Sequence, residues 1–170
     1  MGLAVGEVKL LSYDQDWPKQ FEIEKDNLRR IFGDSMSIEH VGSTSIEGIS
    51  AKPIIDIAIG INKLEDFEQY RQIFEESPEY SIKEDSDKDE ILIRKGPEEN
   101  RTHFIHISEK SSPRFRNYIK FRDYMRNHPD ARDEYENLKR ALASKYADDR
   151  KSYTAAKADY INSIIEKASN

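Results

Sequence analysis

The sequence predicts an α+β domain in which a mixed β-sheet with flanking helices is followed by a C-terminal lobe of about three helices. Strand-like and helical spacings of apolar residues alternate up to residue 112, and only helical spacing follows residue 113. A chain of 170 residues is long enough for one substantial core and short for two. We therefore expect a single domain over 1–170, with an α/β core at 1–112 and a helical lobe at 113–170.

The first half of the core is expected to contain one helix and two strands. A short extended stretch at 7–13 precedes a helix at 16–32, for which Asp16 can serve as a cap and Pro18 suits the first turn. Alternation at 35–41 predicts a strand. The β-branched run at 52–61 predicts a buried strand, with Pro53 tolerated at its start.

The second half of the core is expected to add a helix and an antiparallel meander. Apolar residues recur at helical spacing over 64–77. Three short strand-like runs follow at 80–83, 90–96 and 101–108. The polar segments 84–90 and 96–100 that separate them are typical of exposed turns.

The C-terminal lobe shows three apolar stripes at helical spacing. They cover 115–125, 135–142 and 153–165, and the segments "HPD" and "YADDRKS" break them. Residues 113–170 carry 13 basic and 9 acidic side chains, whereas residues 1–112 carry 14 and 24. This basic excess is typical either of a solvated helix surface or of a surface that meets an anion.

Composition excludes several classes of function. With no cysteine, the chain has no disulfide, no thiolate metal site and no cysteine nucleophile, so any metal must be held by oxygen or imidazole. A net charge of −6 argues against a general nucleic-acid binder. No run approaches the ~20 apolar residues of a membrane span, and no signal-peptide core is present, so we expect a cytoplasmic protein without membrane contact. The oligomeric state is not indicated.

The segment "EHVGSTSIEGISAKPIIDIAIG", residues 39–60, sets a polar turn between two apolar runs. Gly42 and the hydroxyl residues Ser43, Thr44 and Ser45 would open a short helix whose unpaired amides favour an anion such as phosphate. Alternatively, Thr44 with Glu47 fits a capping box, which would satisfy the same amides without a ligand.

Asp56 lies inside the buried run that follows this turn. An ionised carboxylate there needs a metal, a cation such as Lys52 or several hydrogen-bond donors, because burial of an unpaired charge is costly. A glycine-hydroxyl turn followed by such an aspartate indicates phosphate and a divalent cation meeting at one end of a sheet.

Four segments in this order, "HVGSTSIEGISAKPIIDIAIGI", "RTHFIHI", "FRDYMRNHP" and "DDRKSYTAAK", resemble the GrpB family over nearly the whole chain. That family is placed in the nucleotidyltransferase superfamily, so the resemblance implies a nucleotidyltransferase-like fold. It also implies Mg²⁺ or Mn²⁺ and the transfer of a nucleotidyl or phosphoryl group from a nucleotide to a small acceptor. Gly42 and Ser43 match the superfamily's Gly-Ser turn, and Asp56 matches its first strand carboxylate. Ala58 stands where the second carboxylate is expected, which leaves at most one well-held ion.

Histidines could complete such a site. His103 and His106 are three apart, so in a regular strand they face opposite sides of a sheet. We favour His106 beside Asp56, as a metal ligand or a proton acceptor. Glu39 or Glu90 could occupy the place left by Ala58. In the helical lobe, Arg122 and Lys157 fall inside apolar stripes; with Lys139 they would either pair with carboxylates or face the Gly-Ser turn and bind phosphate.

Three functions therefore remain open. The first is the transfer reaction that the resemblance implies, with Asp56 and His106 as the catalytic residues. The second is a binding module for a nucleotide or another phosphorylated small molecule; fusions of family members to dephospho-CoA kinase imply a link to coenzyme A. The third is a hydrolase with a single transition metal held by His40, His106 and Asp56.

Overall fold

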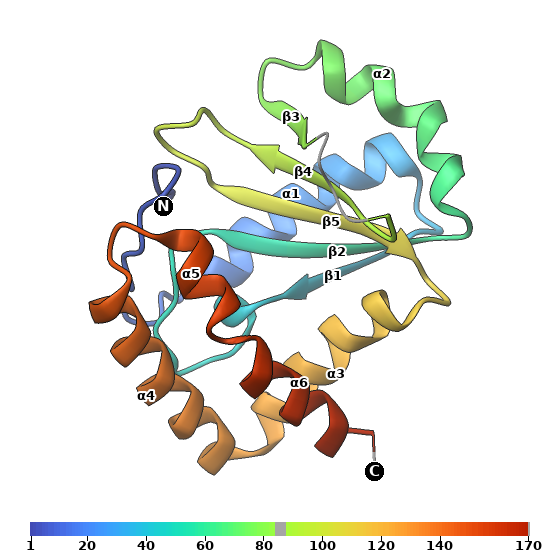
Figure 1. The fold of residues 1–170 in the computed structure, drawn as a ribbon. Helices are drawn as coiled ribbons and strands as arrows, with labels where there is room; N and C mark the ends of the chain where they lie inside the picture. Colours follow the sequence, from blue (N-terminus) through green and yellow to red (C-terminus); the bar gives the residue numbers. More distant parts are fainter. Residues whose placement is uncertain (84–87, 170) are drawn as a thin grey trace.

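The computed structural model describes residues 1–83 and 88–169, which form a five-stranded mixed sheet with helices on both faces (Figure 1). The strands are β1 (Ser37–Val41), β2 (Ile55–Ile61), β3 (Tyr80–Lys83), β4 (Ile91–Lys95) and β5 (His103–Glu109). Their order is β1-β2-β5-β4-β3, and only β2 and β5 are parallel neighbours. The expected meander is confirmed, because β3, β4 and β5 pair antiparallel in sequence order.

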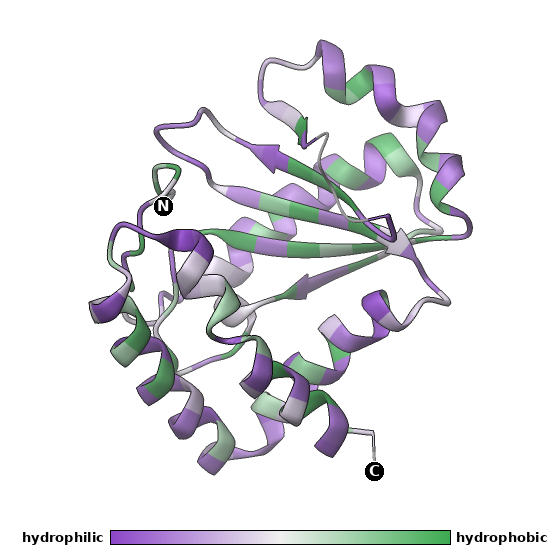
Figure 2. Ribbon diagram, in the orientation of Figure 1, coloured by the Kyte–Doolittle hydropathy of each residue, from purple (hydrophilic) through white to green (hydrophobic). Residues whose placement is uncertain are grey.

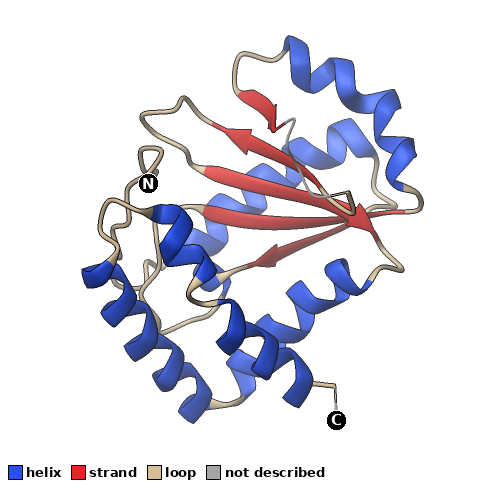
Figure 3. Ribbon diagram, in the orientation of Figure 1, coloured by secondary structure: helices blue, strands red, loops and turns tan. Residues whose placement is uncertain are grey.

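Helices form a layer on each side of the sheet (Figure 3). Helix α1 (Trp17–Phe32) and helix α2 (Glu68–Glu76), the latter preceded by the 3₁₀ helix η2 (Leu64–Phe67), cover one face. Helix α3 (Pro113–Asn127) packs on β1, β2 and β5 from the other side. The remaining helices are α4 (Pro129–Lys145), α5 (Arg150–Ala155) and α6 (Ala158–Lys167), and the turn after β1 forms the 3₁₀ helix η1 (Ser43–Ser45).

The main core lies between the sheet and α1 and α2. Alternate residues of the central strand, Ile55, Ile57, Ile59 and Ile61, are buried there, and the apolar stripes show as green bands on the strands in Figure 2. Each isoleucine that becomes buried contributes about 1.5–3 kcal/mol from the removal of apolar surface from water. This packing fixes β2, so that Asp56 and Ala58 face the opposite side of the sheet.

Two smaller clusters hold the C-terminal helices against that opposite face. One lies between the sheet and α3 and consists of Val41, Ala58 and Phe115. The other joins the loop residues Ile46 and Ile49 to α3, α4 and α6, with Tyr135 and Ile164 among its buried members. Because α3 packs directly on the sheet, the helices after residue 113 form a wall over the sheet face that carries Asp56.

Several local expectations need correction. The stripe at 153–165 is two helices, since the chain turns at Ala156 and Lys157, so the described residues contain four helices after residue 113 rather than three. Asp16 occupies the cap position of α1, but its side chain makes no capping hydrogen bond. Residues 84–87 of the expected turn lie outside the described residues. The single domain over 1–170, divided into an α/β core at 1–112 and a helical lobe at 113–170, stays a prediction.

In the described part of the chain, no helix combines the length and the apolar character that crossing a membrane would require.

Candidate functional site

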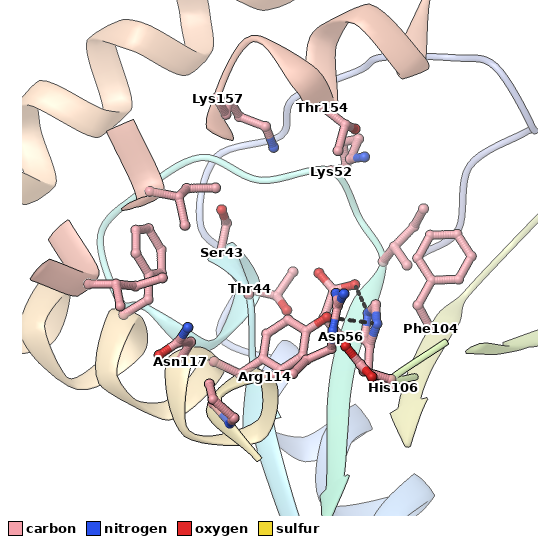
Figure 4. A pocket seen from close by; sticks show the side chains of 18 of the residues that line it. Ser43, Thr44, Lys52, Asp56, Phe104, His106, Arg114, Asn117, Thr154 and Lys157 are labelled. Carbon is pink, nitrogen blue, oxygen red and sulfur yellow. Dashed lines mark hydrogen bonds and ion pairs between the residues drawn. The ribbon is translucent and has the colours of Figure 1, made fainter. Parts of the chain in front are cut away.

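A pocket of about 990 Å³ lies between the face of β2 and β5 that carries Asp56 and His106 and the wall made by α3, α4, α5 and α6 (Figure 4). Its volume is at the upper end of the range for small-molecule sites. The turn after β1 contributes Gly42, Ser43 and Thr44, and the sheet contributes Asp56 and His106. The site predicted from the turn and from the strand aspartate is therefore one continuous pocket.

Gly42 is required by its contact with Asp56. Its φ is +67°, in the region that favours glycine, and a Cβ atom at this position would lie 2.9 Å from the Cβ of Asp56. The turn thus passes directly over the aspartate side chain. Any larger residue would displace either the turn or the carboxylate.

The hydroxyl groups of the turn have different partners. Thr44 Oγ1 lies 3.0 Å from His40 Nε2, and Ser45 Oγ donates a 2.6 Å hydrogen bond to the carbonyl of Gly42. The side chain of Arg126 donates to the carbonyl of Ser45 at 3.0 and 2.7 Å. The predicted capping box with Glu47 does not form, because Thr44 bonds to His40 instead. Gly42, Ser43 and Thr44 line the pocket, whereas Ser45 is a structural residue beneath it.

An imidazole between two carboxylates forms the centre of the pocket. His106 Nε2 lies 3.5 Å from Asp56 Oδ1, and His106 Nδ1 lies 3.3 Å from Glu90 Oε1. The Tyr118 hydroxyl donates to Glu90 Oε2 at 2.7 Å. Burial lowers the pKa of His106, but the two carboxylates outweigh this and raise it to about 9. A ring that is protonated at neutral pH cannot accept a proton, so His106 fits the role of a cation or proton donor better than the predicted base.

The pKa of Asp56 is set by opposing effects. Burial alone would raise it, but the hydrogen bond from His106 and the nearby positive charges of Lys52 and Arg150 hold it below its usual value. The carboxylate is therefore ionised at neutral pH. It faces the pocket as a fixed negative charge.

The opposite wall of the pocket is basic. Figure 4 shows Lys52 and Lys157 facing Ser43 and Asp56 across the pocket, and Arg150 also lines it. None of these three cations forms an ion pair with a carboxylate in residues 1–83 and 88–169. Burial and the neighbouring cations lower the pKa of Lys52 to about 7. Burial likewise lowers the pKa of Lys157 to about 8, although Asp56 opposes the shift.

Instead, these cations lie on aromatic rings. Lys157 Nζ is 4.4 Å from the ring centre of Tyr153, and Lys52 Nζ is 5.5 Å from the same ring. The guanidinium of Arg150 is 4.8 Å from the ring centre of Phe104. Contacts of this kind hold a cation in place without neutralising its charge. The basic wall thus keeps an excess of positive charge directed at the pocket.

Two of the predicted phosphate-binding residues have other partners. Arg122 donates to Glu39 Oε2 at 2.8 Å, to the carbonyl of His40 at 3.0 Å and to Asp123 at 2.7 Å, and it lies outside the pocket. Lys139 lines the pocket but donates to the carbonyl of Ser50 and lies 3.3 Å from Glu136. For these two residues the carboxylate-pairing alternative is the one observed.

The predicted three-ligand metal set does not converge. His40 is stacked on Phe21 of α1, with ring centres 4.8 Å apart, on the sheet face opposite Asp56 and His106. Its burial lowers its pKa to about 4. His103 and His106 lie on opposite faces, as expected. Among the residues that the structure describes, no group of three or more histidine, aspartate or glutamate side chains could hold a metal ion.

The acidic residues of the pocket do not fit the paired ions that the superfamily fold implies. Ala58 lies between Glu39 of β1 and His106 of β5 in the sheet register, so a methyl group stands where the second carboxylate is expected. Glu39 is bound by Arg122, and Glu90 is bound by His106 and Tyr118. Neither glutamate replaces the missing ligand, and Asp56 is left as a single carboxylate.

The pocket residues that sequence reasoning missed include Arg150, Tyr118 and Asn117. Arg150 lies in "YADDRKS", interpreted as a break between helices, and in "DDRKSYTAAK", which carries the family resemblance, but no role in the site was assigned to it. Its spacing of three and seven residues from Tyr153 and Lys157 would have placed it on the same stripe. Tyr118 lies on an apolar stripe, so no sequence signal separates it from a core residue.

Comparison with known proteins identifies the family and the fold of this chain. The family described as "GrpB protein" matches residues 7–167. The chain belongs to the GrpB family. It is 36% identical to the "Glutamate-rich protein GrpB" of Alkalihalophilus pseudofirmus, over 98% of this chain and 99% of that protein. The crystal structure of conserved protein GrpB from Enterococcus faecalis superposes with a TM-score of 0.84 at 31% identity, covering 94% of this chain and 96% of that one.

A more distant likeness concerns the fold. The terminal uridylyl transferase 4 from Trypanosoma brucei, solved with bound dUTP, matches this GrpB protein with a TM-score of 0.52 at 12% identity. The match covers 79% of this chain and 46% of that one. The expected nucleotidyltransferase-like fold is thereby confirmed.

Proposed function

We propose that this GrpB protein binds a phosphorylated small molecule of the nucleotide class, with the phosphates on the basic wall of the pocket. The single observation that carries the proposal is the group of three cations, Lys52, Arg150 and Lys157, that line one pocket without an ion pair in the described residues. Partly buried cations without a carboxylate partner are costly, and a phosphate would supply the missing negative charge.

The shape and composition of the pocket support a ligand larger than a phosphate ion. Its volume of about 990 Å³ and apolar lining residues such as Phe104, Phe121 and Ile161 leave room for a base or another organic group. Ser43, whose position matches the Gly-Ser turn of the superfamily, faces the basic wall (Figure 4). The likeness to a transferase solved with dUTP agrees with a nucleotide, and a coenzyme A-like ligand offers the same phosphate chemistry.

A ligand panel tests this proposal. Thermal unfolding would be followed with nucleoside mono-, di- and triphosphates, coenzyme A and the matching unphosphorylated compounds. At least one phosphorylated compound should raise the melting temperature, and its unphosphorylated form should not. The shift should shrink in Lys157→Met but persist in Lys151→Met, since Lys151 is an exposed neighbour outside the pocket. No shift with any phosphorylated compound would reject the proposal.

Group transfer is the second candidate, and the position of Asp56 favours it. The carboxylate lies under Gly42 and faces the basic wall, where a ligand phosphate would lie beside it. In such a reaction an acceptor hydroxyl attacks the α-phosphorus of a nucleoside triphosphate, its proton passes to water, and pyrophosphate leaves. Labelled nucleoside triphosphate with a mixture of small hydroxyl compounds should then give pyrophosphate and a labelled adduct. Equal turnover by Asp56→Asn would remove Asp56 from this role.

A further inference from the structure

We infer that the pocket binds its phosphorylated ligand without a divalent cation, because protein cations supply the positive charge that a metal ion supplies in the superfamily. The inference rests on the proposed function and concerns how that same site recognises phosphate. Two sets of contacts carry it. In the first set, protein groups already bind the carboxylates that could hold a metal ion. In the second set, the cations of the basic wall contact aromatic rings and so keep their charge for a phosphate.

The carboxylates near Asp56 are bound by protein groups. Glu39, the cross-strand neighbour of Ala58, receives the guanidinium of Arg122 at 2.8 Å. Glu90 receives the hydroxyl of Tyr118 at 2.7 Å and lies 3.3 Å from the imidazole of His106. A metal ion that recruited either glutamate would have to break these contacts and leave a partly buried arginine or tyrosine without its partner.

Asp56 itself shares His106 with Glu90. The two ring nitrogens point at the two carboxylates, at 3.5 Å for Asp56 and 3.3 Å for Glu90. The ring therefore occupies the space between two carboxylates, which is where a bridging ion would have to lie. Since its nitrogens are taken by these contacts, His106 does not offer a lone pair to a metal.

Three cations already face the carboxylate of Asp56. Lys52, Arg150 and Lys157 line the pocket, and each is close enough to Asp56 for their charges to interact. A divalent ion placed among three like charges would be repelled, and only one carboxylate would attract it. A phosphate, by contrast, is attracted by all three side chains. Lysine and arginine are both common phosphate ligands, with arginine able to donate two parallel hydrogen bonds.

The test compares binding of one probe with and without metal. Tripolyphosphate would be titrated into the protein by isothermal calorimetry, once in excess EDTA and once in excess Mg²⁺. We expect binding in EDTA that is at least as tight as in Mg²⁺, because Mg²⁺ neutralises part of the charge of the probe. Binding that is more than about threefold tighter in Mg²⁺ would overturn the inference while leaving the proposed function standing. No binding in either buffer would overturn both.

Asp56→Asn gives a second and independent readout. The substitution keeps the shape of the side chain and removes its charge, so a metal-free site should bind tripolyphosphate as tightly as before or more tightly. If Asp56 holds an ion, the same substitution should weaken binding in Mg²⁺ by about tenfold or more, which would contradict the inference. Far-ultraviolet circular dichroism confirms that the variant is folded. Should it fail to fold, the EDTA comparison on the unaltered protein decides alone.

Discussion

Lys157 is predicted to destabilise the folded protein in the absence of ligand. Its pKa is lowered from 10.5 to about 8, chiefly by burial, so the unfolded chain holds this proton more tightly than the folded one. At neutral pH the difference is worth about 3 kcal/mol as an upper bound, at 1.36 kcal/mol per pKa unit. Because the side chain is only partly buried, solvent screening reduces our expectation to about 1–2 kcal/mol.

Lys157→Met should therefore raise the free energy of unfolding by about 1–2 kcal/mol at neutral pH. The sign follows from linkage: a lysine whose folded pKa is depressed makes the folded state gain stability as the pH rises from about 8 to 10.5. The advantage of the methionine variant should accordingly shrink with rising pH, to less than half at about pH 9.5. Urea unfolding followed by circular dichroism at both pH values measures it.

Lys139→Met is the matched control. Its pKa is also lowered to about 8, yet its ammonium group donates to the Ser50 carbonyl and lies 3.3 Å from Glu136. Removal of these contacts should lower the free energy of unfolding by about 1–3 kcal/mol. If Lys157→Met destabilised the protein as Lys139→Met does, Lys157 would be a paired structural residue, and the argument for an anion site would lose its main support.

Three further outcomes are expected. Ligand affinity should fall as the pH rises from about 7 to 9, because a bound phosphate favours the charged form of the pocket lysines. The fall should reach up to about tenfold per pH unit for each pocket lysine that loses its proton. Calorimetry at several pH values measures it, and an affinity that does not change with pH would mean that the lysines are not involved. Gly42→Ala should displace Asp56 and cost about 1–3 kcal/mol of stability, measured by urea unfolding, and an unchanged unfolding midpoint would contradict the tight contact. Arg122→Met should lower the free energy of unfolding by about 1–3 kcal/mol, because the ion pair with Glu39 is lost, and it should leave ligand affinity unchanged. A loss of ligand binding without a loss of stability would show that Arg122 takes part in binding.

Most of the fold follows from local patterns. Strand β2 is identified by its β-branched run, and α1 and α3 by their helical spacing. The break between α5 and α6 was missed, because Tyr153 and Ile164 belong to one apolar period even though the backbone turns at Lys157. Periodicity reports which side chains are buried, and it does not report whether the backbone between them is continuous.

The sequence predicted those site residues whose type is unusual for their place in the chain. Asp56, Gly42 and His106 were expected to meet, and they do, since a charged residue in a buried strand and a glycine turn both need a tertiary explanation. Arg122 and Lys139 illustrate the limit. A basic residue on a buried stripe can face a ligand or a carboxylate, and the choice depends on which acidic residue the tertiary fold places beside it. Glu39 is 83 residues away from Arg122 in sequence, and nothing local indicates their pairing.

Calorimetric titration of tripolyphosphate into the unaltered protein, Arg150→Met and Lys151→Met tests most directly whether the basic wall is a phosphate site. Arg150 lines the pocket, and its neighbour Lys151 is exposed outside it, so the two substitutions remove one positive charge each at adjacent positions. We predict that Arg150→Met weakens binding by about 10- to 100-fold, equivalent to a charged hydrogen bond of about 1.5–3 kcal/mol, and that Lys151→Met leaves it within about twofold. Equal weakening by both variants would mean that the probe responds to net charge alone and that the pocket is not where it binds.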